Sequence, residues 1–263
     1  MNFISLEAVI IYYNKSKVKS VPKTWEALVK VAKANTKGKS YGFVLDKNNY
    51  YTNRAFYSAC GGTEFTSGTT IGYTKPAFVN FLKFIDKTEK SNIAPKACDG
   101  NTAKTLFMEG NAAFFMDGPW SSGDLDKSKM KGKYGVMTIP KVNGKVAKPF
   151  MGIKTLYMTK VSKNKEATGK FMAFLTSPEI AKDFEKVGHA SANRKVKLTN
   201  FVLKAVADQC DNADVMPTIP AMGQVWQPVA DAIAAVRGGK APAAEAKKAA
   251  DKIKGLINQM HNN

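Results

Sequence analysis

Residue types that commonly carry catalytic chemistry are scarce in this 263-residue chain. The three cysteines, Cys60, Cys98 and Cys210, form no CxxC pair and no zinc-ligand spacing, and their odd number sets no disulfide framework, although one pair with one free thiol stays open. Only His189 and His261 ordinarily titrate near neutral pH, and neither lies in an HExxH motif. With no GxSxG elbow and no readable triad, the sequence predicts no catalytic residue, no metal ligand and no cofactor.

Arginine is also scarce, although the formal net charge is +19. Arg54, Arg194 and Arg237 are the only arginines, whereas lysines are spread from Lys15 to Lys254. A nucleic-acid binder usually concentrates basic residues on one element and uses arginine for bidentate contacts. The diffuse lysine coat therefore favours solvation in, or adhesion to, an anionic environment, and we expect no nucleic-acid partner.

Long apolar runs are absent as well. No stretch of roughly eighteen apolar residues exists, so the sequence predicts no membrane span. The opening residues 1–6 are too short for a secretory signal, which leaves two explanations open: a signal was removed, or the chain begins inside a longer protein. Apolar residues still make up 44% of the chain, enough for a real core, so disorder is excluded as a global description.

What the sequence does contain is an alternation of apolar strands and amphipathic helices. The continuous apolar run at 9–13 is typical of a strand buried on both faces. Thr24 is a suitable N-cap for a helix that directs Trp25 into the core, and Pro76 opens another helix. Further strands are expected at 41–45, 112–116, 134–139 and 156–159. This alternation predicts a mostly parallel, doubly wound sheet.

Two tryptophans follow proline-containing turns. Trp120 comes directly after Gly118-Pro119, and Trp226 follows the segment 216–220 with its two prolines. A ring held at the end of an element suits stacking against the apolar face of a sugar. The alternative interpretation is that both are ordinary core or rim tryptophans.

Several separate blocks, in this order, resemble the maltose/maltodextrin-binding proteins, the extracellular sugar receptors of ATP-binding-cassette importers. The blocks lie at residues 7–15, 22–26, 118–120, 148–152 and 216–220. The similarity runs through nearly the whole chain. It implies an α/β, two-lobe periplasmic-binding-protein-like (type II) fold with the sugar clamped between the lobes.

The resemblance also implies a division of the chain. Hinge crossings are expected near 7–9 and 151–153, the second lobe at 10–150 plus 197–263, and a returning segment of the first lobe at 154–196. The leading part of the first lobe has no counterpart before Met1, so we expect that lobe to be only partial and sugar binding to be weak or lost.

A partial first lobe would leave apolar helix faces uncovered. Phe171, Met172 and Leu175 are expected to be exposed there and to favour self-association. The partners that the resemblance implies are an oligosaccharide and the membrane permease of an importer. The implied location is the cell surface, as a lipid-anchored lipoprotein, or the periplasm.

Five site residues can be carried over from the family. Glu7 corresponds to a hinge-side carboxylate that accepts hydrogen bonds from sugar hydroxyls, and Tyr50 to an aromatic and hydroxyl contact. Trp120 and Trp226 correspond to stacking platforms. Asn48 stands where the family often has a carboxylate, and because an amide both donates and accepts, the hydroxyl pattern recognised is expected to differ. Two alternatives stay open: a scaffold or interaction fragment without a ligand, and a receptor for a different oligosaccharide. An enzyme on a related two-lobe scaffold is the third class, which the missing catalytic motifs disfavour.

Overall fold

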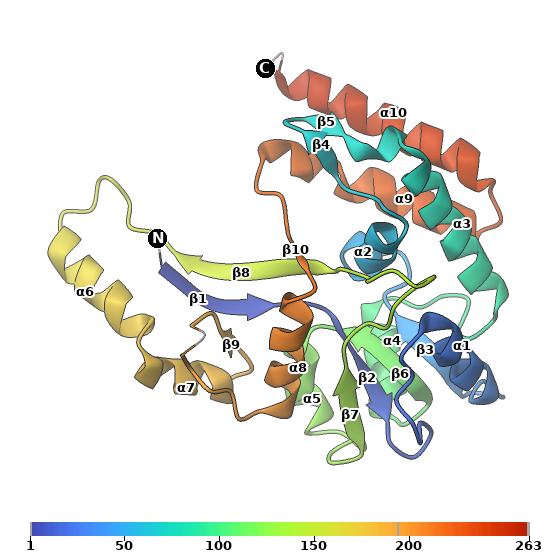
Figure 1. Ribbon diagram of the computed structural model, residues 1–263, viewed down its shortest axis with the longest axis horizontal. Helices are drawn as coiled ribbons and strands as arrows, with labels where there is room; N and C mark the ends of the chain where they lie inside the picture. The colour runs from blue at the N-terminus through green and yellow to red at the C-terminus, as the bar shows by residue number, and fades with distance from the viewer. Residues whose placement is uncertain (1, 194, 262–263) are drawn as a thin grey trace.

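The computed structural model describes residues 2–193 and 195–261. Its strands are β1 (Asn2–Glu7), β2 (Ile10–Asn14), β3 (Tyr41–Leu45), β4 (Phe65–Ser67), β5 (Thr70–Ile71), β6 (Ala112–Asp117), β7 (Tyr134–Met137), β8 (Phe150–Leu156), β9 (Ala190–Ser191) and β10 (Asp214–Val215). Its helices are α1 (Trp25–Ala34), α2 (Tyr50–Ala59), α3 (Pro76–Lys90), α4 (Gly100–Met108), α5 (Ser122–Leu125), α6 (Lys165–Leu175), α7 (Pro178–Lys186), α8 (Phe201–Cys210), α9 (Trp226–Arg237) and α10 (Pro242–His261), with short 3-10 turns η1 (Gly72–Thr74), η2 (Pro119–Ser121) and η3 (Pro220–Gln224). Figure 1 shows these elements arranged around two four-stranded sheets, while β4 and β5 form a separate two-stranded sheet.

The larger sheet has the strand order β3-β6-β2-β7. β3 and β6 are parallel, but β2 is antiparallel to both of its neighbours, with Ile11 opposite Met116 on one side and Met137 on the other. The expectation of a mostly parallel sheet is therefore wrong. β2 enters directly from β1 of the other sheet after only two residues, so no helical crossover precedes it and sets its direction.

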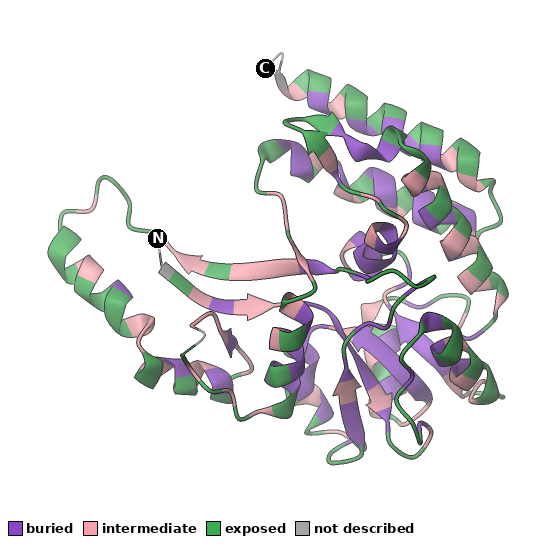
Figure 2. Ribbon diagram, in the orientation of Figure 1, coloured by how far each residue is buried: buried purple, intermediate pink, exposed green. Residues whose placement is uncertain are grey.

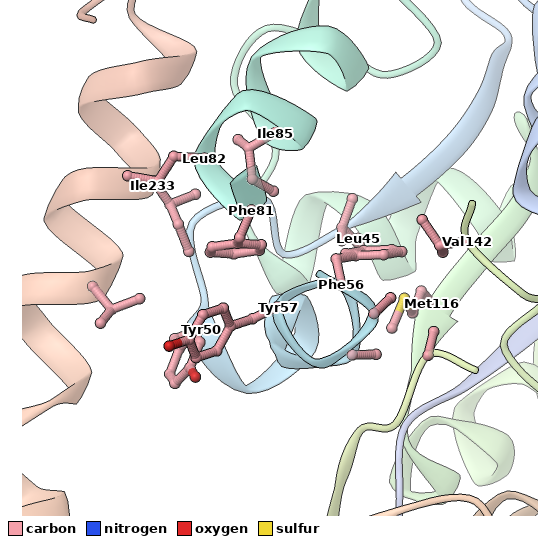
Figure 3. Close-up of a cluster of buried hydrophobic side chains, with 14 of the residues drawn as sticks. Leu45, Tyr50, Phe56, Tyr57, Phe81, Leu82, Ile85, Met116, Val142 and Ile233 are labelled. Carbon is pink, nitrogen blue, oxygen red and sulfur yellow. The ribbon is translucent and has the colours of Figure 1, made fainter. Parts of the chain in front are cut away.

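This sheet and the helices α1 to α5, α9 and α10 make up what we call the core region. Trp25 is buried, as its position after the Thr24 cap predicts, and the Thr24 hydroxyl accepts a hydrogen bond from Ala27 N at 3.2 Å. The predicted apolar stripe of α3 is also buried, and Figure 3 shows Phe81 from that stripe beside Tyr57 of α2. Burial of aromatic side chains on both helices closes one face of the sheet.

The smaller sheet has the order β10-β8-β1-β9, and with α6 and α7 it makes up the extension. The strand expected at 156–159 lies earlier, at Phe150–Leu156. Strand β8 ends where Leu156 pairs with Asn2 of β1, so the apolar residues that follow have no partner strand in the described part of the chain. α8 packs against β1 of the extension and against β7 of the core region, and it joins the two.

The helices of the extension are poorly covered (Figure 2). Phe171 is 59% exposed, as expected, and Phe174 is 52% exposed. The expectation for Met172 is wrong, since Met172 is buried. Helix α6 contacts β1 and α7, and neighbouring helix residues point about 100° apart, so Met172 is covered where Phe171 is not. Leu175 is half-buried. The extension thus presents an apolar helix side that the described residues leave open.

Candidate functional site

Four aromatic rings from four different elements form a continuous row, which we call the aromatic arc. Ring centroids lie 5.9 Å apart between Trp226 and Phe150, 6.1 Å between Phe150 and Tyr51, and 6.3 Å between Tyr51 and Trp120. These four rings come from the starts of α9, β8 and α2 and from η2. The two tryptophans singled out from the sequence are therefore connected through Phe150 and Tyr51, neither of which the sequence-based reasoning selected.

Trp120 is the most open ring of the arc, with half of its surface exposed. Its indole folds back over the turn that precedes η2, and a Cβ at Gly118 would lie 2.2 Å from ring atoms. Glycine is therefore required there for the ring to take this position. Next to it, burial raises the pKa of Asp117, while hydrogen bonds from Ser121 and the Trp120 indole act in the opposite direction.

The hydroxyl of Tyr51 is buried and has no hydrogen-bond partner, the single such side-chain atom in the part of the chain that the structure describes. Burial, followed by the nearby carboxylate of Glu7, raises the pKa of this phenol, so it stays protonated and able to donate. A buried polar group without a partner costs about 1–3 kcal/mol. A ligand oxygen placed at this point of the arc would remove that cost.

Tyr50, the residue carried over as a site contact, is buried beside the arc, with its ring centroid 5.9 Å from that of Trp226 and 6.1 Å from that of Phe150. It is 1% exposed, its hydroxyl donates to Glu64 Oε1 at 2.5 Å, and it accepts from the Tyr73 hydroxyl at 3.0 Å. The Asn49 side chain caps α2 by accepting from Tyr51 N, and neighbouring residues on a helix point about 100° apart. The helix therefore directs Tyr50 inward and Tyr51 toward Trp120.

Asn48 is exposed and does not join the arc. It lines a separate hollow of about 790 Å³ together with Asp46, Glu89 and Arg237. The Arg237 guanidinium and the buried Lys47 ammonium both bond Glu89, each at 2.7 Å. This hollow contains charges that already pair with one another.

Glu7 lies at the end of β1, where the chain passes from the extension into the core region. It is half-buried, and its Oε2 accepts from Lys154 Nζ at 2.7 Å. Gly152 faces it across the β1–β8 ladder, and a Cβ there would lie 2.7 Å from Glu7 Cγ. The glycine therefore leaves room for the carboxylate, which also influences the Tyr51 phenol electrostatically.

Behind the arc, Arg54 of α2 holds the start of β8 and β10 in place. Its guanidinium donates to Glu64 at 3.1 Å through both Nε and Nη2, and its Nη1 donates to Asp214 Oδ2 at 2.6 Å and to Lys148 O at 2.8 Å. The same group lies 4.7 Å from the Phe150 ring centroid. Burial lowers the pKa of Arg54, but the hydrogen bond and charge of Glu64 outweigh that effect and keep it above its usual value.

The Arg54 network was not found from the sequence, although an isolated arginine in a lysine-rich chain is a usable signal. Arginine presents a planar set of five donors that lysine cannot reproduce. Here that set joins α2 to Lys148, just before β8, and to Asp214 of β10. It thereby fixes Phe150, and with it the centre of the arc.

Other chemistry is not apparent in the described ranges, 2–193 and 195–261. No group of three or more His, Cys, Asp or Glu residues there could hold a metal ion, and no described helix is long and apolar enough to cross a membrane. Cys60, Cys98 and Cys210 are free thiols. Burial raises the pKa of each, to about 11 for Cys98 and about 12 for Cys210.

An α/β fold of two sheets, with an aromatic row beside the strands that cross between them, is typical of a receptor that clamps a small ligand. The model of the family described as bacterial extracellular solute-binding protein matches residues 4–182. This chain belongs to that family.

Two curated relatives match nearly the whole chain. The maltooligosaccharide ABC transporter solute-binding lipoprotein of Streptococcus pneumoniae serotype 4 is 30% identical over 97% of this chain and 64% of its own length. The galactooligosaccharide-binding protein of Bacillus subtilis is 28% identical over 98% of this chain and 66% of its own length. The chain therefore spans about two thirds of the length of these relatives.

Solved structures agree with this family. A cyclo/maltodextrin-binding protein complexed with maltotetraose superposes with a TM-score of 0.91 at 28% identity, covering 99% of this chain and 71% of the other. A Staphylococcus aureus extracellular solute-binding protein in complex with maltose gives 0.90 at 28% identity, covering 98% and 71%. The resemblance to maltodextrin-binding proteins and the fold it implies are confirmed.

Proposed function

We propose that this chain binds maltodextrin-like oligosaccharides along the aromatic arc, as the receptor component of an ATP-binding-cassette importer. The observation that carries the proposal is the arc itself, where a half-exposed indole and an unpaired phenol lie side by side. Relatives and structural neighbours with maltooligosaccharide or maltodextrin in their names support the substrate class. The proposal makes the protein a binding receptor and not an enzyme.

The residues of the proposed site would do different tasks. The indoles of Trp120 and Trp226 stack on pyranose faces, by analogy with aromatic pairs worth about 0.5–1.5 kcal/mol each beyond area burial. The Tyr51 hydroxyl donates to a sugar oxygen. The Glu7 carboxylate accepts from a sugar hydroxyl while it also accepts from Lys154. We place no sugar contact on Tyr50, and Asn48 would contribute only if a long ligand reaches its separate hollow.

The division of the chain follows the same proposal. Residues 10–150 and 197–263 form the second lobe, residues 154–196 belong to the first, and the crossings at 7–9 and 151–153 act as the hinge. Sugar bound between lobes would favour the closed arrangement, which a membrane permease could distinguish from the open one. Such a receptor works outside the cytoplasmic membrane, as a lipoprotein or a periplasmic protein.

In this proposal Trp120, Tyr51 and Trp226 all contact the ligand from one side, the side of the arc. We therefore expect this 263-residue chain to bind maltotriose more weakly than micromolar. Titration calorimetry at high protein concentration measures the affinity directly, and a micromolar or tighter Kd would contradict the expectation of weak binding.

The binding site is tested by two substitutions and one matched control. Trp120→Ala and Tyr51→Phe should each weaken maltotriose binding about tenfold, because one removes a stacking surface and the other a donor. Val146→Ala, an exposed apolar residue outside the arc, should leave binding unchanged. Saturable maltotriose binding that neither arc substitution alters would overturn the assignment of the site, and no binding by any variant would overturn the function.

A galactooligosaccharide is the second candidate ligand, because one of the relatives carries that name at a similar identity. Both sugars offer apolar ring faces to an aromatic row. Tryptophan fluorescence separates the candidates when the chain is titrated in turn with maltotriose, a β-galactooligosaccharide and cellotriose. A response to the galactooligosaccharide alone would replace the maltodextrin assignment.

A further inference from the structure

A groove on the core region, outside the aromatic arc, has an unusual charge. It has a volume of about 680 Å³ and lies between α1 and α3, with residues 143 and 145 of a turn at its edge. Five lysines line it, whereas Glu26 is its one acidic lining residue. The five are Lys33, Lys83, Lys87, Lys90 and Lys145.

Four of these lysines are not paired with any carboxylate in the part of the chain that the structure describes. Lys90 bonds Asp86 at 2.7 Å, and the others make no ion pair. The hollow that contains Asn48 shows the opposite arrangement, since its lysines and arginine lie among Asp46, Glu89 and Asp99. The excess of positive charge is therefore a local property of this groove and not only a reflection of the lysine-rich composition.

The floor of the groove is apolar. Trp25, Val29 and Phe84 line it, and the Trp25 and Phe84 ring centroids lie 5.4 Å apart. Trp25 is buried, while Val29 and Phe84 are only partly buried and remain open to a ligand. Apolar surface of this kind gains nothing from an inorganic polyanion, but it gains from an apolar side chain.

The rim also carries amides. Asn80 and Asn143 are exposed and can both donate and accept hydrogen bonds. A peptide backbone presents both donors and acceptors, so it matches such groups. Charge, floor and rim together are complementary to a protein segment that combines carboxylates with apolar side chains.

We propose that this groove docks an acidic, apolar-containing segment of a partner protein. Carboxylates of the segment pair with Lys33 of α1, Lys83 of α3 and Lys145 of the turn, and an apolar side chain contacts Phe84. The surface lies on residues distinct from those of the arc, so this docking does not depend on sugar binding.

The test uses a short fluorescent peptide in which glutamates alternate with leucines. Lys33→Gln, Lys83→Gln and Lys145→Gln together should weaken its binding about tenfold, because each exposed pair contributes modestly. The matched control replaces Lys160, Lys163 and Lys182, exposed lysines of the extension without ion pairs among the described residues, and should change the affinity less than about twofold. Binding is followed by fluorescence anisotropy near 0.1 M salt, where electrostatic attraction beyond about 10 Å is largely screened.

Two further readouts localise the contact. Replacing the leucines of the peptide by serine should weaken binding several-fold, because the floor then has no apolar partner. Cys60 lines the groove and Cys210 does not, so the peptide should slow alkylation of Cys60 and leave Cys210 unaffected.

Several outcomes would overturn the proposal. Equal losses in the groove and control triple variants would assign the binding to the diffuse lysine coat. Full binding of the serine peptide, or polyphosphate that competes and depends on the groove lysines in the same way, would make the groove a site for an anionic polymer. Failure of the leucine peptide to saturate would remove the site altogether.

Discussion

The core region and the extension are built from similar helices and strands, but they bury their apolar residues very differently. Phe81 of α3 is fully buried, whereas Phe171 and Phe174 of α6 are more than half exposed and Val187 after α7 is 69% exposed. Amphipathic pattern alone therefore does not secure burial: a helix also needs a sheet face broad enough to cover it. The core region has such a sheet, and the extension presents to α6 little more than β1.

The largest expected effect tests this difference directly. Phe81→Ala should lower the free energy of unfolding by about 3–5 kcal/mol, because it leaves a cavity in the core. Phe171→Ala should change it by less than about 0.5 kcal/mol. Urea denaturation followed by circular dichroism measures both. Similar losses for the two variants would show that the extension is packed as tightly as the core region.

An effect of similar size is expected where the two regions join. Arg54→Ala leaves Glu64 buried without its cation, so the free energy of unfolding should fall by about 3–5 kcal/mol. Lys186→Ala removes an exposed, solvent-screened pair with Asp183 and should leave the free energy of unfolding nearly unchanged. If Arg54→Ala cost as little as the control, the starts of β8 and β10 would not depend on this network.

A smaller effect distinguishes two adjacent tyrosines. Tyr50→Phe should cost about 1–3 kcal/mol of stability, because Glu64 and Tyr73 lose a hydrogen-bond partner. Tyr51→Phe should cost nothing measurable or stabilise slightly, since its hydroxyl bonds no described residue. Thermal unfolding of both variants provides the comparison, and the reverse order would place Tyr50 at the surface and Tyr51 in the interior.

The extension should also respond to acid. Burial raises the pKa of Glu185, but hydrogen bonds from Asn200 N and Thr199 N, both at 2.5 Å, outweigh it and hold the pKa below its usual value. The carboxylate therefore stabilises the link between α7 and α8 above about pH 4.5, and this contribution is lost as the pH falls through the lowered value.

Hydrogen exchange at Thr199 and Asn200 measures this acid response. After correction for the intrinsic rate, protection should fall about tenfold between pH 6 and pH 3, as expected for losing a charged acceptor. In Glu185→Gln the protection should be low and independent of pH. A pH profile unchanged by the substitution would assign the acid response to another group.

The smallest effect on stability is expected from substitutions that alter only association. Phe171→Ser with Phe174→Ser should leave the unfolding free energy nearly unchanged but reduce self-association through the open side of α6. Val21→Ser with Val146→Ser removes comparable exposed apolar groups from the core region and should not change association. Light scattering across a concentration series measures the molar mass of both variants and of the unsubstituted chain. If the unsubstituted chain is a monomer at all concentrations, the expectation of self-association is contradicted.

Local sequence signals predicted the elements well but not how they combine. The Thr24 cap, the Pro76 helix start and the burial of Trp25 depend on neighbouring residues, and the structure confirms them. The direction of β2 depends on where β1 comes from, which no local pattern encodes. The sheet was therefore predicted as mostly parallel and is mixed.

The candidate site was predicted in part for the same reason. The turns before Trp120 and Trp226 marked two ends of the arc, because each turn acts on its own ring. The middle of the arc depends on how α2 is rotated about its axis. Tyr50 and Tyr51 are neighbours on that helix, but the Tyr50 hydroxyl bonds buried Glu64 whereas the Tyr51 ring joins the arc. Arg54 acts through Asp214, 160 residues away, and such a partner is visible only after folding.

The passage from β1 through Ala8 and Val9 into β2 has a consequence for how the molecule comes to be made. Strands β1 and β2 have their hydrogen-bonding partners much later in the chain, at residues 112–117, 134–137, 150–156 and 190–191. During translation β1 and β2 must therefore stay unpaired until these later segments have emerged. Contacts of such long sequence separation slow folding, so nascent chains of this protein are exposed to aggregation and to chaperones for longer than a chain whose first hairpin closes locally.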